Sequence, residues 1–142
     1  MVILTLNCGS PSAKYQLYDW ENRQVLARGI VERVGIEGSF IKHRAHGKEE
    51  HTLEFECPDH KVAIQRIIDT IVSPDYGAIT DIHLIKSVGH RVVHGGEQFA
   101  QSVVVNDQVL NAFREVADLS PLHNPANITG IEAAQSVLPD VP

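Results

Sequence analysis

Residues 85–97 concentrate side chains that could do chemistry: an arginine, two histidines and a glutamate beside two consecutive glycines. Their apolar, β-branched content predicts a buried strand over Asp81–Val93. Arg91 in such a strand is costly to bury without an anionic partner, and its guanidinium can hold a carboxylate or phosphate by two parallel hydrogen bonds. The alternative is a structural Arg91 paired to Glu97 or a nearby aspartate, and the stretch alone favours neither.

A second candidate is the segment Asn7–Pro11, whose composition is typical of a turn between two predicted strands, Val2–Leu6 and Tyr15–Trp20. Hydroxyls, exposed amides and an ammonium at one hairpin tip can bind a phosphate. The glycine spacing and following helix of a Walker motif are absent. Taken alone, the segment favours an ordinary hairpin turn. The side chains that the tip would present are Ser10, Ser12 and Lys14.

Histidines form a third group. His43, His46 and His51 lie in a predicted hairpin formed by Ser39–Ala45 and Glu50–Cys57. A metal site is conceivable, but no carboxylate or thiol is spaced to complete one, so we expect solvated loop histidines. The other pair, His90 and His94, falls on one face of the predicted strand, and we interpret it as structural.

The elements that must position these residues follow from periodicity and capping. A buried stripe predicts a helix over Pro58–Val72, with Asp59 at its cap or in its first turn. Two more helices are predicted, the first capped by Asn106 and the second begun by Pro125. The order indicates one α/β domain, whose sheet mixes antiparallel hairpin strands with a parallel strand reached through a crossover helix. The remaining predicted elements are strands Gln24–Val34 and Ser102–Val105 and helices Asp107–Ala117 and Ala126–Val137.

Composition narrows the classes of protein. With 142 residues the chain can bury one sizeable core, and its 43% apolar and 21% charged residues are ordinary for a soluble globular domain. A net charge of −6 without a basic run argues against nucleic-acid or anionic-membrane surfaces. We find no signal segment and no membrane-length apolar run. Cys8 and Cys57 form no Cys-x-x-Cys pair, so we expect a reduced, cytoplasmic protein with ordinary thiols.

Three strings of the sequence together resemble the signatures of the acetate kinase family, ATP-dependent enzymes that form acyl phosphates. They are Leu-Thr-Leu-Asn-Cys-Gly-Ser-Pro-Ser-Ala-Lys at 4–14, Val-Gly-His-Arg-Val-Val-His-Gly-Gly-Glu at 88–97 and Ser-Pro-Leu-His-Asn-Pro-Ala-Asn at 120–127. The resemblance covers essentially the whole chain, in family order. It implies an α/β, ribonuclease-H-like (actin-like ATPase) domain, a mixed sheet with helices that lacks its last strand.

The resemblance also implies a chemistry, the transfer of the γ-phosphoryl group of ATP to acetate, with Mg²⁺ as cofactor. Arg91 would hold the acetate carboxylate or the phosphoryl group, and His123 would donate to the phosphoryl oxygens. Asn7 would lie beside the metal-bound phosphates. The loop residues Ser10, Ser12 and Lys14 would bind phosphate. Val93 and Leu122 would form the walls of a pocket for the methyl group.

Family members are much longer, so residues 1–142 would be a truncated N-terminal domain without the second, nucleotide-binding domain. The catalytic aspartate strand, a second histidine and arginine and the adenosine pocket would be missing, and the isolated chain is expected to be inactive. The intact enzyme would be a homodimer acting on acetate and ATP, without nucleic-acid or membrane partners. In the phosphate loop, Pro11 stands where the family usually has serine and removes a backbone N–H, and Ala13 replaces a larger apolar residue.

Two alternatives stay open. The first is that the chain belongs to a close relative that acts on propionate. The size of the substrate pocket decides between acetate and propionate, and one methylene contributes only about 1–3 kcal/mol of discrimination in such a pocket. A stand-alone domain that binds a phosphate or a partner through its unfinished sheet would not be an enzyme at all.

Overall fold

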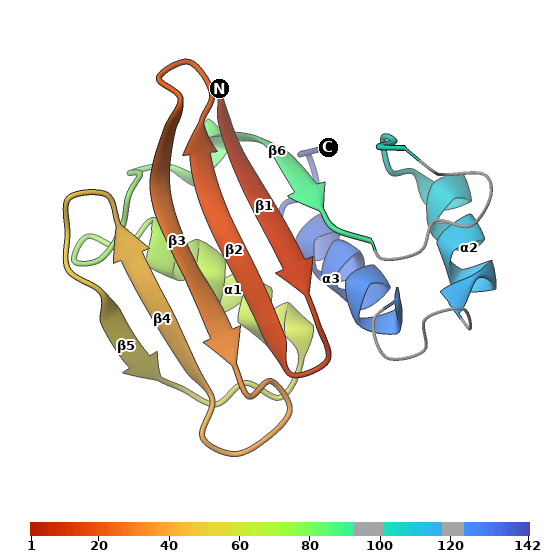
Figure 1. The fold of residues 1–142 in the computed structure, drawn as a ribbon, viewed down its shortest axis with the longest axis horizontal. Coiled ribbons are helices and arrows are strands. Elements are labelled where there is room, and N and C mark those ends of the chain that lie inside the picture. Colours follow the sequence, from red (N-terminus) through yellow and green to blue (C-terminus); the bar gives the residue numbers. More distant parts are fainter. Residues whose placement is uncertain (93–100, 118–123) are drawn as a thin grey trace.

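The computed structural model describes residues 1–92, 101–117 and 124–142, which fold into a twisted sheet with helices on one side (Figure 1). The sheet has six strands in the order β5-β4-β3-β2-β1-β6. Neighbouring strands are antiparallel except β1 and β6, which run parallel. The strands are β1 (Val2–Cys8), β2 (Ser12–Asp19), β3 (Gln24–Glu32), β4 (Phe40–Ala45), β5 (His51–Glu54) and β6 (Ile85–His90).

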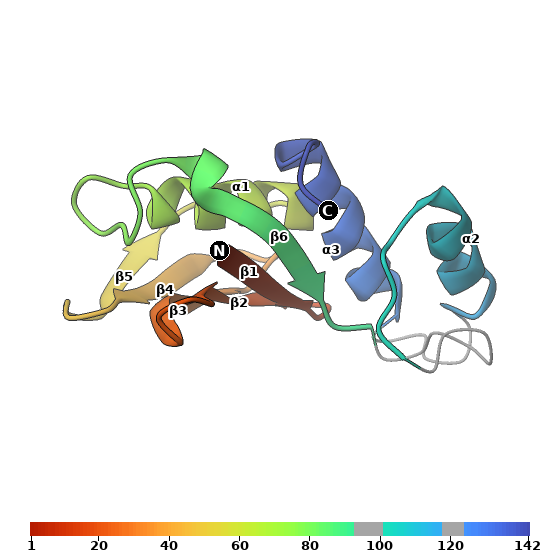
Figure 2. The ribbon, with the colours of Figure 1, turned by 90° about the horizontal axis from the view of Figure 1, so that it is seen from above.

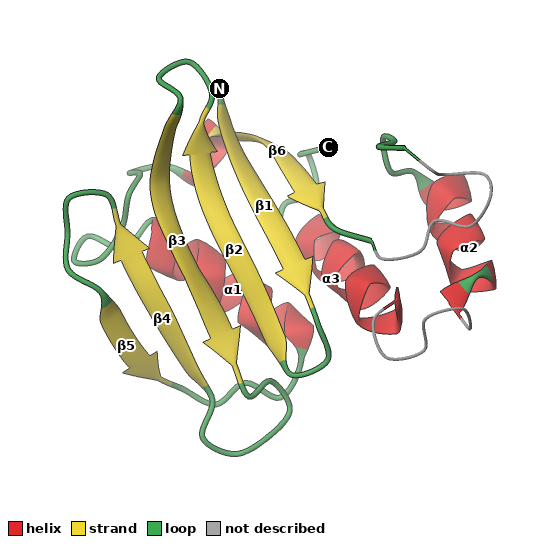
Figure 3. Cartoon of the chain, viewed as in Figure 1, coloured by secondary structure: helices red, strands yellow, loops and turns green. Residues whose placement is uncertain are grey.

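Helix α1 (His60–Ile71) makes the crossover between the antiparallel strands and β6, as predicted from the sequence. Helix α3 (Asn124–Val137) lies beside it on the same face of the sheet, and α2 (Asp107–Glu115) packs farther out (Figure 2). The opposite face of the sheet carries no helix in the described part of the chain (Figure 3). We call this side the open face. It is the face to which the side chains of Asn7, Lys14 and Arg28 belong in the strand register.

Local chemistry accounts for the helix starts. The Asp59 carboxylate accepts from the Val62 amide at 2.9 Å, and the Asn106 side chain accepts from the Val109 amide at 2.9 Å. Such side chains satisfy amides that the first helical turn leaves without partners. The predicted helix caps are therefore confirmed.

Two apolar clusters hold the elements together. The main cluster lies between the sheet and the helices α1 and α3, and a smaller one joins α2 to α3. In α1 the isoleucines at spacing three and four face the sheet and are almost fully buried, which confirms the stripe read from the sequence. These side chains are Ile64, Ile67, Ile68 and Ile71. None of the helices in the described part of the chain is long and apolar enough to cross a membrane.

The predicted strand Asp81–Val93 is shorter in the structure. Ile82–Leu84 form a 3₁₀ turn, whose His83 amide donates to the Asp81 carboxylate at 2.9 Å, and β6 covers Ile85–His90. Arg91 follows the end of the strand and is exposed, so it does not need a partner to compensate burial. The predicted strand Ser102–Val105 is wrong: this segment has no ladder partner in the described residues, and a strand exists only through pairing.

The expectation of solvated loop histidines is wrong for His43, which is 1% exposed. Its Nε2 donates to the carbonyl of Tyr76 at 2.9 Å, so its Nδ1 accepts the hydroxyl proton of Tyr15. Tyr15 reaches it across β3 because Gly29, between them in the register, has no side chain. The register, rather than the loop composition, therefore determines this burial.

The other two histidines of that group differ from each other. His51 is half-buried, with its ring 4.6 Å from that of Tyr76, whereas His46 is exposed as expected. Among the described residues, no group of three or more His, Cys, Asp or Glu side chains could hold a metal ion.

Candidate functional site

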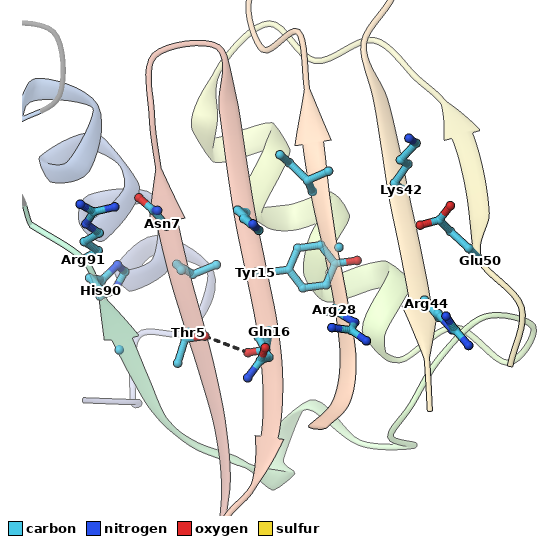
Figure 4. A pocket seen from close by; sticks show the side chains of 15 residues that line it. Thr5, Asn7, Tyr15, Gln16, Arg28, Lys42, Arg44, Glu50, His90 and Arg91 are labelled. Atoms are coloured by element: carbon cyan, nitrogen blue, oxygen red, sulfur yellow. Dashed lines mark hydrogen bonds between the residues drawn. The ribbon is translucent and has the colours of Figure 1, made fainter. Parts of the chain in front are cut away.

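Three residues from separate parts of the chain meet where β1, β2 and β6 lie side by side. Asn7 is the register partner of Lys14, and the Arg91 amide donates to the Leu6 carbonyl at 3.1 Å, which places Arg91 next to Asn7. Figure 4 shows the Asn7 and Arg91 side chains at this corner of the open face. An amide and two cations thus converge, a combination suited to binding an anion.

The serines of the predicted phosphate loop lie at the adjacent turn. Ser10 is exposed in the turn between β1 and β2, which the Gly9 amide closes onto the Ser12 carbonyl at 2.9 Å. Ser12 and Lys14 belong to β2 rather than to the tip, and Asn7 belongs to β1, so the predicted turn is shorter in the structure. Alternation along β2 puts Ser12 on the same face as Lys14. The hairpin also accommodates Pro11, whose exposed ring leaves its carbonyl to accept the Val34 amide at 2.8 Å.

Part of the predicted site lies outside the described residues. These residues are Val93, Leu122 and His123, together with the proposed partner Glu97 and the second strand histidine His94. The structure therefore brings together Asn7, Lys14 and Arg91, with Ser10 and Ser12 nearby.

A hollow of about 890 Å³ extends from this corner across the open face. Five cations line it and one carboxylate, Glu50, although the whole chain carries a net charge of −6. Within residues 1–92, 101–117 and 124–142, no ion pair engages any of the five. The cations are Lys14, Arg28, Lys42, Arg44 and Arg91.

Sequence reasoning missed Arg28, Lys42 and Arg44. Period-two alternation along each strand indicates that these three residues lie on the face opposite the helices. Only the pairing of β3 with β4 shows that the three side chains lie close together. Arg28 and Arg44 are direct register partners, and like charges in that arrangement repel each other. The open face is therefore strongly positive beside the candidate site.

Burial decides the charge of two neighbouring groups. Desolvation lowers the pKa of His90 to about 4, so its imidazole is neutral at neutral pH. Desolvation also raises the pKa of the Cys8 thiol to about 11, so it stays protonated. Cys8 and Cys57 are both buried free cysteines, as the expectation of ordinary thiols requires. The positive charge of the corner comes from Arg91 and Lys14, without a contribution from His90.

The donor atoms at the corner determine whether it suits the expected Mg²⁺. Mg²⁺ takes oxygen ligands, keeps several waters and is commonly bound through one or two carboxylates plus substrate phosphates. Asn7 offers one amide oxygen at the corner, and the described residues contain no cluster able to form an all-protein centre. The residues fit a cation that arrives with phosphates and gains one oxygen from Asn7.

Comparisons with known proteins agree on one family. The sequence profile of the acetokinase family matches residues 2–142. Acetate kinase from Geobacter sulfurreducens is 60% identical over 142 residues, all of this chain and 34% of the relative. Acetate kinase from Treponema pallidum is 58% identical over the same span, 32% of its length. The chain thus spans about a third of the length of the curated relatives it matches.

Solved structures give the same answer for the fold. The crystal structure of Porphyromonas gingivalis acetate kinase matches 99% of this chain and 35% of its own, with a TM-score of 0.95 and 41% identity. That of a propionate kinase from Francisella tularensis matches 99% of this chain and 35% of its own, with a TM-score of 0.87 and 33% identity. Both neighbours have the actin-like ATPase fold, which confirms the predicted fold class. By sequence, by fold and by the match of the whole span, the chain belongs to the acetokinase family.

Proposed function

We propose that this chain is the N-terminal part of an acetate kinase, which transfers the γ-phosphoryl group of ATP to acetate and forms acetyl phosphate and ADP. The observation that carries the proposal is the convergence of Asn7, Lys14 and Arg91 on one corner of the open face. The names of the relatives support the same reaction.

Phosphoryl transfer needs alignment of the reactants and neutralisation of charge on the oxygens in flight, with little covalent work by the protein. Arg91 follows the half-buried strand β6, whose backbone pairs with β1, so its exposed guanidinium is directed by a rigid element. In the proposal it holds the acetate carboxylate or the phosphoryl group. Lys14 then neutralises a phosphate that stays bound throughout, and Ser10 and Ser12 donate to its oxygens.

Asn7 would contribute one oxygen to Mg²⁺ that enters with ATP, and the bound ion would neutralise charge on the phosphates. His123 as a donor to the phosphoryl oxygens and Val93 and Leu122 as walls of the methyl pocket belong to the same proposal. We further propose that the whole enzyme is a cytoplasmic homodimer.

We also propose that the 142-residue chain alone does not turn over, because it spans about a third of its relatives and would lack the second, nucleotide-binding domain. The test compares the 142-residue chain with the full-length protein in a coupled assay of acetyl phosphate formation from acetate and MgATP. We expect turnover at rates normal for kinases, about 1–100 s⁻¹, in the full-length protein alone. Such turnover by the 142-residue chain would contradict its inactivity, and no turnover in either would contradict the function.

A propionate kinase is the second candidate, favoured by the similarity to the Francisella tularensis structure. The ratio of kcat/KM for acetate and propionate decides between the two, because one methylene changes the barrier by about 1–3 kcal/mol in an apolar pocket. A stand-alone phosphate- or partner-binding domain is the third candidate. A native mass close to 15.7 kDa would favour it, and a much larger mass would favour the enzymes.

A further inference from the structure

Two consecutive backbone carbonyls at the end of β1 each accept a hydrogen bond from a buried side chain in the first turn of a helix. The side-chain amide of Asn127 in α3 donates to the Cys8 carbonyl at 2.7 Å. The Nε2 of His60 in α1 donates to the Gly9 carbonyl at 2.7 Å. Asn127 is 3% exposed and His60 9%, so neither bond competes freely with water. We call this pair of bonds the carbonyl clamp.

The hydrogen bond from Asn127 to the Cys8 carbonyl takes the place of one from a neighbouring strand. The Leu6 carbonyl accepts the Arg91 amide from the β6 side, and carbonyls two residues apart on a strand point to the same edge. The Cys8 carbonyl is thus the next acceptor on that edge, where β6 has already ended at His90. Asn127 supplies the donor there, and the helix packs closely because Gly130 lies against the Cys8 side chain.

The His60 bond joins the same turn to α1. The ring lies 2.7 Å from the Gly9 carbonyl and 3.4 Å from that of Ser12, and a carbonyl only accepts, so Nε2 carries the proton. The Pro11 carbonyl accepts from Val34, and the Ser12 carbonyl from Gly9. Four carbonyls around the turn are thus engaged by donors of the protein itself.

We propose that His60 and Asn127 are positioning residues of the phosphate-binding corner, an inference that rests on the proposed function. Carbonyl oxygens repel phosphate, and an anion site needs donors and cations directed at it. The clamp ties the Cys8 and Gly9 carbonyls to the helix layer, on the opposite side of the sheet from the open face. Residues 7–14 therefore present to an anion the hydroxyls of Ser10 and Ser12 and the ammonium of Lys14, rather than the Cys8 and Gly9 carbonyls.

Variants of matched shape test the clamp in the full-length protein. N127D replaces the donating nitrogen by an oxygen of the same size, and H60F removes the ring donor. H60Q restores a side-chain N–H and is the conservative rescue. N111D and H83F are the controls, because Asn111 in α2 and His83 in the 3₁₀ turn are exposed and make no part of the clamp.

We expect N127D and H60F each to raise KM for MgATP about tenfold, while KM for acetate changes less than about twofold. H60Q should recover most of the loss, and the controls should behave as wild type. Equal changes in both KM values, or a fall in Tm with unchanged kinetics, would show that the two bonds serve folding alone and would overturn the proposal.

A readout that does not depend on turnover separates the clamp from the proposed function. Calorimetric binding of inorganic pyrophosphate and hydrogen exchange of residues 9–14 are measured on the same proteins. Weaker pyrophosphate binding and faster exchange in N127D would support the clamp even if no acetyl phosphate formed. Binding and exchange equal to wild type in both N127D and H60F would contradict it.

Discussion

The two faces of the sheet are built from the same strands, but one face forms the apolar core and the other carries the candidate binding site. Side chains facing α1 and α3 are apolar and almost fully buried, among them Leu4, Leu17 and Ile41. The open face carries the five cations, none of which has an ion-pair partner among the described residues, and the Asn7–Arg91 corner, which faces solvent. Because neighbouring residues of a strand alternate between the faces, stability and chemistry are interleaved along the chain but separated in space.

This comparison predicts that a substitution on one face changes either activity or stability, but not both. Open-face substitutions should alter binding and rate with little effect on unfolding. Helix-face substitutions should do the reverse.

Arg91→Ala should give the largest effect. Loss of the guanidinium should lower kcat for acetyl phosphate formation about a hundredfold or more, because it acts on charge that develops in the transition state. Lys14→Ala should mainly raise KM, since its phosphate is held throughout the reaction. Both variants should keep the wild-type Tm within a few degrees, because both side chains are exposed. Steady-state kinetics of the full-length enzyme decide it, and equal losses of kcat would remove the distinction.

Gly29→Ala and Gly89→Ala compare two strand glycines that face opposite sides. A Cβ on Gly29 would collide with the Lys42 carbonyl and the Tyr15 hydroxyl, whereas one on Gly89 would meet the Thr5 methyl at 3.7 Å, an ordinary contact. We expect Gly29→Ala to lower the free energy of unfolding by about 1–3 kcal/mol and Gly89→Ala to stay within about 0.5 kcal/mol. Urea unfolding measures both. Equal destabilisation would show that the faces are packed alike.

Acid should destabilise the fold before it protonates the surface carboxylates. Burial lowers the pKa of His43 and that of His90, the latter to about 4, below the usual 6.5. The unfolded chain therefore binds more protons between these values, so the stabilisation is complete above pH 6.5 and falls as the pH drops toward 4.

Unfolding free energies at pH 7.5, 6 and 5 measure this dependence. H90Q should flatten part of the slope. A pH-independent stability across this range would contradict the assigned burial of both imidazoles.

The smallest effect concerns the outer edge of β6. The Val88 amide donates to the Pro142 carbonyl at 2.8 Å, so one position of this edge is covered and the association expected of an unpaired strand is reduced. We expect weak, concentration-dependent association of the 142-residue chain in light scattering. Extending the chain with the segment that follows in its full-length relatives should suppress it. A clean monomer at high concentration would show that Pro142 and its neighbours suffice.

Sequence patterns were sufficient to predict those helices and strands that are determined by residues close together in the chain. The stripe of α1, the caps Asp59 and Asn106 and the apolar and turn patterns of the first five strands predicted their elements to within a few residues. Specific strings predicted the family, which the comparisons confirm. Ser102–Val105 failed because β-branched composition favours a strand without providing a neighbour to pair with.

The site itself depended on contacts between distant parts of the chain. The sequence determined which side chains exist and how they alternate, because helix and strand periodicity acts over a few residues. The tertiary structure decided that Arg91 lies beside Asn7, that Gly29 lets Tyr15 reach a buried His43, and that Asn127 binds the carbonyl of Cys8, 119 positions away. Strand register and helix packing set these neighbours, and both are fixed by burial of the whole core rather than by any local pattern.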